Sequence, residues 1–191
     1  MADLSKMIKE SDHKVVFCFG RMNPPTIGHA QVWDTMEDLA QEHDCFAFIV
    51  PSHTHDDEKN LIPYGEKFSL IKKYVETMCY AQTYVRDLGH SPWDVVGALI
   101  DAGAKEIYFV CGSDKFEDFK SLENIDSAKV TVVQAGEDRN EEGSLIERAS
   151  STLMRDYARK NEFANYRKMC PDHGRNQELA KMSYSLLRGN L

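Results

Sequence analysis

Residues 20–29 of the chain read Gly20-Arg21-Met22-Asn23-Pro24-Pro25-Thr26-Ile27-Gly28-His29. The stretch follows an apolar run at residues 15–19, which predicts a buried strand, and it precedes apolar residues at helical spacing. The start of a helix after a tight Gly/Pro loop offers unpaired backbone N–H groups and partial positive charge. Gly20 lets the backbone approach a ligand closely, and the two prolines stiffen the loop. The stretch therefore predicts a loop that holds a phosphate group.

The composition is ordinary for one globular domain, with 191 residues, 42% of them hydrophobic and 28% charged. We expect a core at residues 14–160 and a C-terminal helical segment at 161–191. No apolar run approaches the length of a membrane span, and residues 1–12 lack the apolar centre of a signal peptide. The five cysteines show no CxxC spacing, and the three inside apolar runs (Cys18, Cys45 and Cys111) are expected to be reduced core thiols, which predicts a cytoplasmic protein. The net charge of −8 argues against nucleic acid as a partner, although a local cation pocket can still hold a small anion.

Apolar runs alternate with helical patterns along the chain. The expected strands span residues 15–19, 45–50, 82–86, 106–111 and 129–133. The expected helices span 27–40, 65–77, 91–103, 148–160 and 177–187, with a short aromatic-rich helix after residue 114. Such alternation implies right-handed crossovers and parallel strands. The expected fold is α/β: a Rossmann-like, doubly wound, five-stranded parallel sheet with C-terminal helices, whose ligand lies beyond the carboxyl ends of the strands.

Several motifs resemble those of the HIGH-motif nucleotidyltransferase superfamily. Residues 20–29 are similar to its GxFxPxxxGH signature, with Met22 in the Phe position. The second signature, ISxTxxR, resembles Ala149-Ser150-Ser151-Thr152-Leu153-Met154-Arg155, in which Ala149 replaces the usual Ile. Gly112-Ser113-Asp114 matches a GxD that follows the fourth strand in this superfamily. Lys59-Asn60 with Lys67 is loosely similar to its K-N…K/R element.

The resemblance implies that an acceptor phosphate attacks the α-phosphate of a nucleoside triphosphate, with release of pyrophosphate. It implies catalytic roles for His29, Arg155 and Lys59. The implied nucleotide-binding residues are Gly20, Arg21, Met22, Asn23, Thr26, Gly28, His29, Gly112, Asp114, Ser150, Ser151, Thr152 and Arg155. The candidates for substrate binding are Lys67, which the resemblance supplies, and Arg86 and Trp93, which lie at a strand end and a helix start. We expect Mg²⁺ to bind through the nucleotide phosphates, because no carboxylate cluster suggests a protein metal site.

The motifs favour ATP over CTP. Cytidylyltransferases typically carry RTxGIST at the second signature, whereas this chain has Glu147-Arg148-Ala149-Ser150. The start and end motifs look more like nicotinamide-nucleotide and pantetheine-phosphate adenylyltransferases, so the small phosphorylated acceptor is expected to be nicotinamide mononucleotide. The long polar loops also resemble those of short nucleotidyltransferase-like proteins encoded by bacteriophages. Cytidylyltransferase activity, pantetheine-phosphate adenylyltransferase activity and a non-catalytic nucleotide-binding regulatory protein stay open as alternatives, as does a homo-oligomer.

Simpler explanations exist for some of these patterns. Ser150 and Asp114 can act as helix caps, and Lys59 and Lys67 can be solvated. The polar loop at residues 52–64 contains two histidines and two aspartates, but it lacks metal-ligand spacing, and we interpret it as a solvated loop. Residues 181–185 resemble the KMSKS loop of class I aminoacyl-tRNA synthetases, yet they continue a helical apolar stripe and are expected to be helical.

Overall fold

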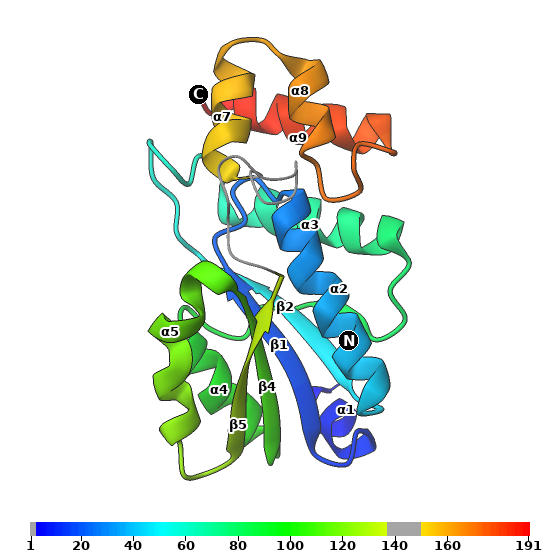
Figure 1. Ribbon diagram of the computed structural model, residues 1–191, viewed down its shortest axis with the longest axis vertical. Coiled ribbons are helices and arrows are strands. Elements are labelled where there is room, and N and C mark those ends of the chain that lie inside the picture. The colour runs from blue at the N-terminus through cyan, green and yellow to red at the C-terminus, as the bar shows by residue number, and fades with distance from the viewer. Residues whose placement is uncertain (1–2, 137–149) are drawn as a thin grey trace. The chain divides into compact units, whose positions relative to one another are not determined.

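The computed structural model describes residues 3–136 and 150–191 (Figure 1). Their contacts group into two compact units, one made of residues 3–19, 32–50 and 80–136, the other of 20–31, 51–79 and 150–191. The sequence also predicts a polar loop at 136–143; its residues 137–143 and the expected helix start at 148–149 lie outside the described residues. The strands are β1 (Lys14–Gly20), β2 (Phe46–Pro51), β3 (Thr83–Val85), β4 (Glu106–Gly112) and β5 (Lys129–Ala135). The helices are α1 (Leu4–Glu10), α2 (Ile27–Glu42), α3 (Tyr64–Met78), α4 (Pro92–Asp101), α5 (Phe116–Phe119), α7 (Ser151–Arg159), α8 (Phe163–Lys168) and α9 (Gln177–Gly189), with 3₁₀ turns η1 (Ser113–Lys115) and η2 (Lys120–Asn124).

The five strands form one parallel sheet in the order β3-β2-β1-β4-β5. Val15 of β1 is paired with Ile107 of β4, and Phe109 of β4 with Val132 of β5. The strand order reverses between β1 and β4, since β2 and β3 lie on one side of β1 and β4 and β5 on the other. The expected doubly wound α/β fold is confirmed, and each predicted strand is present within one or two residues.

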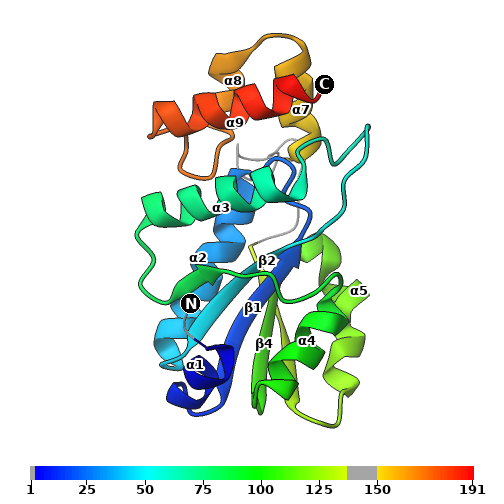
Figure 2. The same cartoon turned by 180° about the vertical axis from the view of Figure 1, so that it is seen from behind.

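The first unit covers both faces of the sheet with helices. On one face, Phe17, Phe48 and Phe109 belong to a single buried cluster with Val95 and Leu99 of α4, which also includes Met7 and Ile8 of α1. Residues 32–42 of α2 lie on the opposite face, as the two views show: α2 is in front of the sheet in Figure 1, and α1 and α4 are in front of it in Figure 2. Burial on both faces explains why the strand sequences are continuously apolar.

The second unit contains α3 and the three C-terminal helices. Helices α7, α8 and α9 pack on one another, and α9 also packs against α3. Tyr166 of α8 is buried and shares a hydrogen bond of 2.7 Å with Ser183 of α9. Residues 181–185 lie inside α9, so the helical interpretation of the KMSKS-like segment is confirmed. The expectation of one domain, with a core at 14–160 and a helical segment at 161–191, stays a prediction.

Two short helices were not expected from the sequence. Helix α1 has seven residues and buries only Met7 and Ile8, and α8 has six residues and buries Tyr166. Elements this short give no helical repeat that a sequence pattern can reveal. The prediction of core cysteines is confirmed for Cys18, Cys45 and Cys111, which are buried free thiols. None of the helices described is long and apolar enough to cross a bilayer.

Candidate functional site

Thr26 and His29 close the first turn of α2 by reciprocal hydrogen bonds. The Thr26 carbonyl accepts the Ala30 N–H at 3.1 Å, and the Thr26 hydroxyl accepts the His29 N–H at 3.4 Å. In return, Nδ1 of His29 accepts the Thr26 N–H at 3.0 Å. This is the geometry of a capping box, with histidine in the place that Glu or Gln usually takes. The sequence carried a signal for it, because Thr26 and His29 have the capping-box spacing, but the prediction treated them only as ligand contacts.

The cap fixes the protonation of the His29 ring. Because Nδ1 accepts a backbone N–H, the ring proton resides on Nε2, which is the atom able to donate to an oxyanion. His29 is half-buried at the start of α2, where helix N–H groups also favour negative charge. A ring in this tautomer can act as a donor only through Nε2.

The rest of the first signature forms a compact turn. Met22 is buried in a left-handed backbone conformation with φ of 47°, whereas Arg21 is exposed. A Cβ at Gly20 would come within 3.3 Å of the Met22 methyl carbon, so a side chain there would crowd the turn. Gly28 is half-buried in the first turn of α2.

Arg155 brings the two signatures together in the second unit. Its Nη1 donates to the Asn23 carbonyl at 2.9 Å and to the Lys59 carbonyl at 2.9 Å, and its Nη2 donates to the Thr152 hydroxyl at 2.9 Å. Burial lowers the pKa of Arg155, and the neighbouring charges of Arg159 and Arg21 lower it further. Residues more than 90 positions apart in the chain thus meet at one guanidinium.

The hydroxyls of the second signature contact the protein itself. Ser150 caps α7, because its hydroxyl accepts the Leu153 N–H at 3.1 Å. Ser151 donates to the Pro24 carbonyl at 2.8 Å, which is a second bridge between the signatures. Ala149 lies outside the described residues. The role of these groups toward phosphate stays a prediction.

Lys67 is fully buried in α3, so the alternative of a solvated lysine is wrong. Its ammonium donates to the Ser52 carbonyl at 2.6 Å and to the Thr54 carbonyl at 3.4 Å. Burial lowers the pKa of this amine to about 8. Lys67 therefore holds the start of the loop that follows β2, whereas Lys59 in the same loop is exposed.

The other candidates lie in the first unit. Asp114 is inside the 3₁₀ turn η1, whose N-cap is Gly112, so the explanation of Asp114 as a helix N-cap is wrong. A Cβ at Gly112 would lie 3.0 Å from Oδ1 of Asp114, so a larger residue there would require the Asp114 carboxylate to shift. The Arg86 guanidinium lies over the rings of Phe48 and Tyr84, with its carbon 5.9 and 5.4 Å from their centres. Trp93 is 48% exposed at the start of α4.

The side chains give little support to a protein metal cage. Across residues 3–136 and 150–191, no three His, Cys, Asp or Glu side chains gather as ligands. In the polar loop, Asp56 instead accepts the backbone N–H groups of Glu58, Lys59 and Asn60. These hydrogen bonds hold the pKa of its carboxyl well below its usual range.

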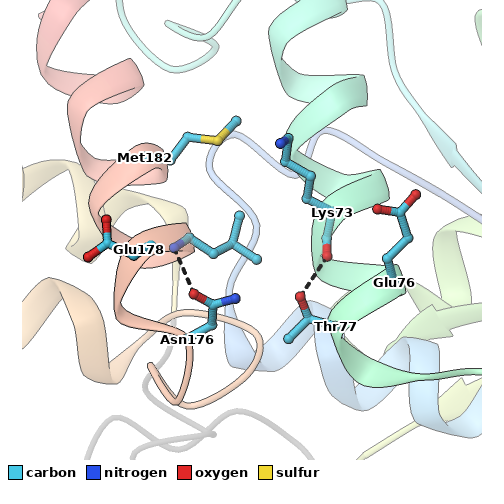
Figure 3. A pocket seen from close by; sticks show the side chains of 7 residues that line it. Lys73, Glu76, Thr77, Asn176, Glu178 and Met182 are labelled. Carbon is cyan, nitrogen blue, oxygen red and sulfur yellow. Dashed lines mark hydrogen bonds between the residues drawn. The ribbon is translucent and has the colours of Figure 1, made fainter.

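A shallow groove of about 390 Å³ lies between α3 and α9 (Figure 3). Its lining residues are Lys73, Glu76, Thr77, Asn176, Glu178, Leu179 and Met182. Asn176 caps α9 through the Leu179 N–H, and Thr77 donates to the Lys73 carbonyl, so these polar groups serve the helices (Figure 3). The groove contains no residue of either signature.

The family of the chain follows from a match along most of its length. A profile of the cytidylyltransferase-like family matches residues 17–163, which include both signatures. The chain belongs to this family. It is therefore a member of the nucleotidyltransferase superfamily, as the motifs predicted. No curated protein matches the chain significantly in sequence.

Solved structures share this family member's fold at low sequence identity. A Vibrio parahaemolyticus protein assigned as a nicotinate-nucleotide adenylyltransferase has a TM-score of 0.60 and 16% identity, over 89% of this chain and 98% of that one. Plasmodium falciparum nicotinic acid mononucleotide adenylyltransferase in complex with NaAD has a TM-score of 0.59 at the same identity and coverage. Thermotoga maritima TmcAL, bound to alpha-thio ATP, has a TM-score of 0.52 and 12% identity, over 91% of this chain and 55% of that one. Such identities support the fold alone.

Proposed function

We propose that the protein is an adenylyltransferase that moves AMP from ATP to a phosphate-bearing acceptor, with a pyridine mononucleotide as the favoured acceptor. An oxygen of the acceptor phosphate attacks the α-phosphorus of ATP, and a new P–O–P linkage forms. The bond from the α-phosphorus to the bridging oxygen of the β-phosphate breaks, and its electron pair leaves with pyrophosphate. Nothing is oxidised or reduced, and no covalent intermediate on the protein is required.

The observation that carries the proposal is the meeting of the two signatures. Arg155 and Ser151 bind the Asn23 and Pro24 carbonyls, so the second signature is held against the phosphate loop of the first. The same stretch carries His29, whose Nδ1 accepts the Thr26 N–H and so leaves Nε2 as its donor nitrogen. In our proposal His29 donates to the α- and β-phosphates, while the start of α7 receives the departing pyrophosphate.

Catalysis would rest on positioning and charge stabilisation. Holding the acceptor oxygen and the α-phosphorus in line can supply about 7–11 kcal/mol of the barrier. Helix N-termini, His29 and Lys59 would stabilise the charge that grows on the bridging oxygen. Mg²⁺ would be held by the triphosphate oxygens and would neutralise part of their charge.

Two observations support ATP as the nucleotide and a pyridine mononucleotide as the acceptor. The second signature lacks the RTxGIST pattern typical of cytidylyltransferases, which favours ATP. Relatives in fold are named for nicotinate-nucleotide and nicotinic acid mononucleotide transfer, which favours a pyridine mononucleotide and a place in NAD biosynthesis. The carboxylate and carboxamide forms of the pyridine ring should therefore be compared directly.

The test is a matrix of pyrophosphate-release assays with Mg²⁺. ATP and CTP are each combined with nicotinamide mononucleotide, nicotinic acid mononucleotide, 4′-phosphopantetheine or no acceptor. We expect release with ATP that depends on a pyridine mononucleotide, and a dinucleotide product by mass spectrometry. Release with CTP alone would assign a cytidylyltransferase, and nucleotide binding without release under every condition would assign the regulatory protein instead.

A further inference from the structure

We propose that Asn23 is a positioning residue that fixes the loop carrying Lys59, and that its side chain does not contact the nucleotide. We call residues 52–63 the Lys59 loop. The catalytic consequence of this proposal rests on the proposed function, whereas the structural tie between Asn23 and the loop can be tested without it.

Both polar atoms of the Asn23 side chain form hydrogen bonds with the backbone of one residue of the Lys59 loop. Its Nδ2 donates to the Ile62 carbonyl at 2.8 Å, and its Oδ1 accepts the Ile62 N–H at 3.0 Å. Asn23 is 1% exposed, and Ile62 is fully buried. The carboxamide binds both the N–H and the C=O of one buried residue, as a neighbouring strand residue would. It therefore fixes the orientation of the Ile62 backbone as well as its distance from Asn23. Only Asn offers a donor and an acceptor at this length.

The Lys59 loop is held at its start and middle as well. At its start, the Ser52 N–H donates to the Gly20 carbonyl at 2.8 Å, and the buried Lys67 ammonium donates to the Ser52 carbonyl. In the middle, Arg155 donates to the Lys59 carbonyl. Asn23 supplies the tie at the end of the loop. Arg155 therefore holds the backbone of Lys59 directly, and residues 20–29, which also carry His29, hold both ends of its loop through Gly20 and Asn23.

Fixing the backbone matters because the Lys59 side chain is exposed and long. A lysine stem has many rotamers, and its ammonium reaches a defined place only if the backbone is defined. Misplacing a catalytic group by about 1 Å can cost on the order of a hundredfold in rate. Loss of the Asn23 tie should therefore remove most of what Lys59 contributes, without removing Lys59.

The first experiment measures whether the Asn23 side chain holds the end of the Lys59 loop. Hydrogen exchange is followed in peptides covering residues 52–63, without ligand, for the wild-type chain, Asn23→Asp and Asn23→Ala. Asn23→Asp has the same shape but replaces the Nδ2 donor with oxygen, which then faces the Ile62 carbonyl. We expect at least tenfold faster exchange at the end of the loop in both variants. Glu58→Gln, an exposed change within the loop, is the control and should leave exchange unchanged. Unchanged exchange in Asn23→Asp would overturn the proposal.

The second experiment separates positioning from ligand contact. The Kd for α,β-methylene ATP and the kcat are measured for Asn23→Asp, Asn23→Ala, Lys59→Ala and the double variant Asn23→Ala/Lys59→Ala. We expect kcat to fall at least tenfold in both Asn23 variants, with less than a threefold change in Kd. When Lys59→Ala is added to Asn23→Ala, kcat should fall by less than a further threefold. A large loss of nucleotide affinity or fully additive effects would make Asn23 a direct contact and overturn the proposal. If the wild-type chain releases no pyrophosphate, the proposed function fails, and hydrogen exchange still decides the tie.

Discussion

Nδ1 of His29 accepts the backbone N–H of Thr26 at 3.0 Å, so one side chain both caps α2 and presents a donor at its other ring nitrogen. In most capping boxes the residue at this place is Glu or Gln, whose side chain lacks the second ring nitrogen of an imidazole. The histidine combines a structural and a chemical task, and the two tasks can be separated by substitution.

His29→Gln should keep the fold and lose activity. Gln can accept the Thr26 N–H as a normal capping-box residue, but it cannot place an imidazole Nε2–H at the phosphates. We expect unfolding free energy within about 0.5 kcal/mol of wild type and turnover at least about a hundredfold lower, which corresponds to about 2.7 kcal/mol. His29→Ala should show the same loss of turnover and an additional stability loss of about 1 kcal/mol. Urea unfolding and pyrophosphate release measure the two effects, and near-normal turnover in either variant would remove His29 from the mechanism.

Arg155→Met should destabilise the protein, because it leaves the buried carbonyl of Asn23 and the carbonyl of Lys59 without the guanidinium donor. We expect a loss of about 1–3 kcal/mol in the free energy of unfolding. Arg159→Met, on the same helix, is the matched control: Arg159 is exposed and pairs with Asp156 at 3.3 Å, and its loss should cost less than about 1 kcal/mol. Equal effects of the two changes in urea titrations would contradict the bridging role.

Because of Lys67, we expect the free energy of unfolding to rise at high pH. The pKa of Lys67 is about 8 in the folded chain, below the ordinary value, so above pH 8 the native state releases this proton before the unfolded state does. The unfolded state then binds more protons, and stability increases up to about pH 10, by at most about 3 kcal/mol from this group. Lys67→Met lacks the group and should lack the rise. Parallel pH curves for the wild type and the variant, from urea unfolding at pH 7 to 10, would show that the site holds no buried ammonium.

Because of Glu37, we expect the free energy of unfolding to fall at low pH. Burial alone would raise the pKa of this carboxyl, but hydrogen bonds from the Thr83 hydroxyl, Gln41 and the backbone of Ala81 and Gln82 outweigh burial and lower it. The stabilisation is therefore complete above the unfolded pKa of about 4.3 and is lost as pH falls through the folded value. Glu37→Gln should cost about 1–3 kcal/mol at pH 7, and the difference should shrink toward pH 3. Exposed Asp38→Asn is the control, and a constant difference across pH would refute the assignment.

Much of the fold was predictable because burial on both sheet faces leaves continuous apolar runs. Residues 15–19 and 106–111 lie within observed strands β1 and β4, and α4 begins at Pro92, one residue after the predicted helix start. The short helices α1 and α8 were missed, since each buries too few residues to leave a periodic pattern. The motifs identified the superfamily because their glycine, proline and histidine positions have strict spacing.

The site was predicted as a set of residues, but not as a set of contacts. The sequence indicated Asn23, Lys67 and Arg155 as ligand-binding groups, and the structure shows each of them bonded to backbone groups of the protein. Those bonds join segments more than ten positions apart, and in two cases more than 30. A sequence pattern records spacing along the chain and holds no information about which carbonyl meets a guanidinium after folding.

Sequence alone was enough to predict a parallel α/β sheet and the two signatures of the nucleotidyltransferase superfamily, because periodicity and turn chemistry are local properties. Only the tertiary structure decided that Lys67 is buried, that Arg155 bridges the Asn23 and Lys59 carbonyls, and that Asn23 pairs with Ile62. These facts depend on burial and on long-range hydrogen bonds, which exist only once the separate segments pack together.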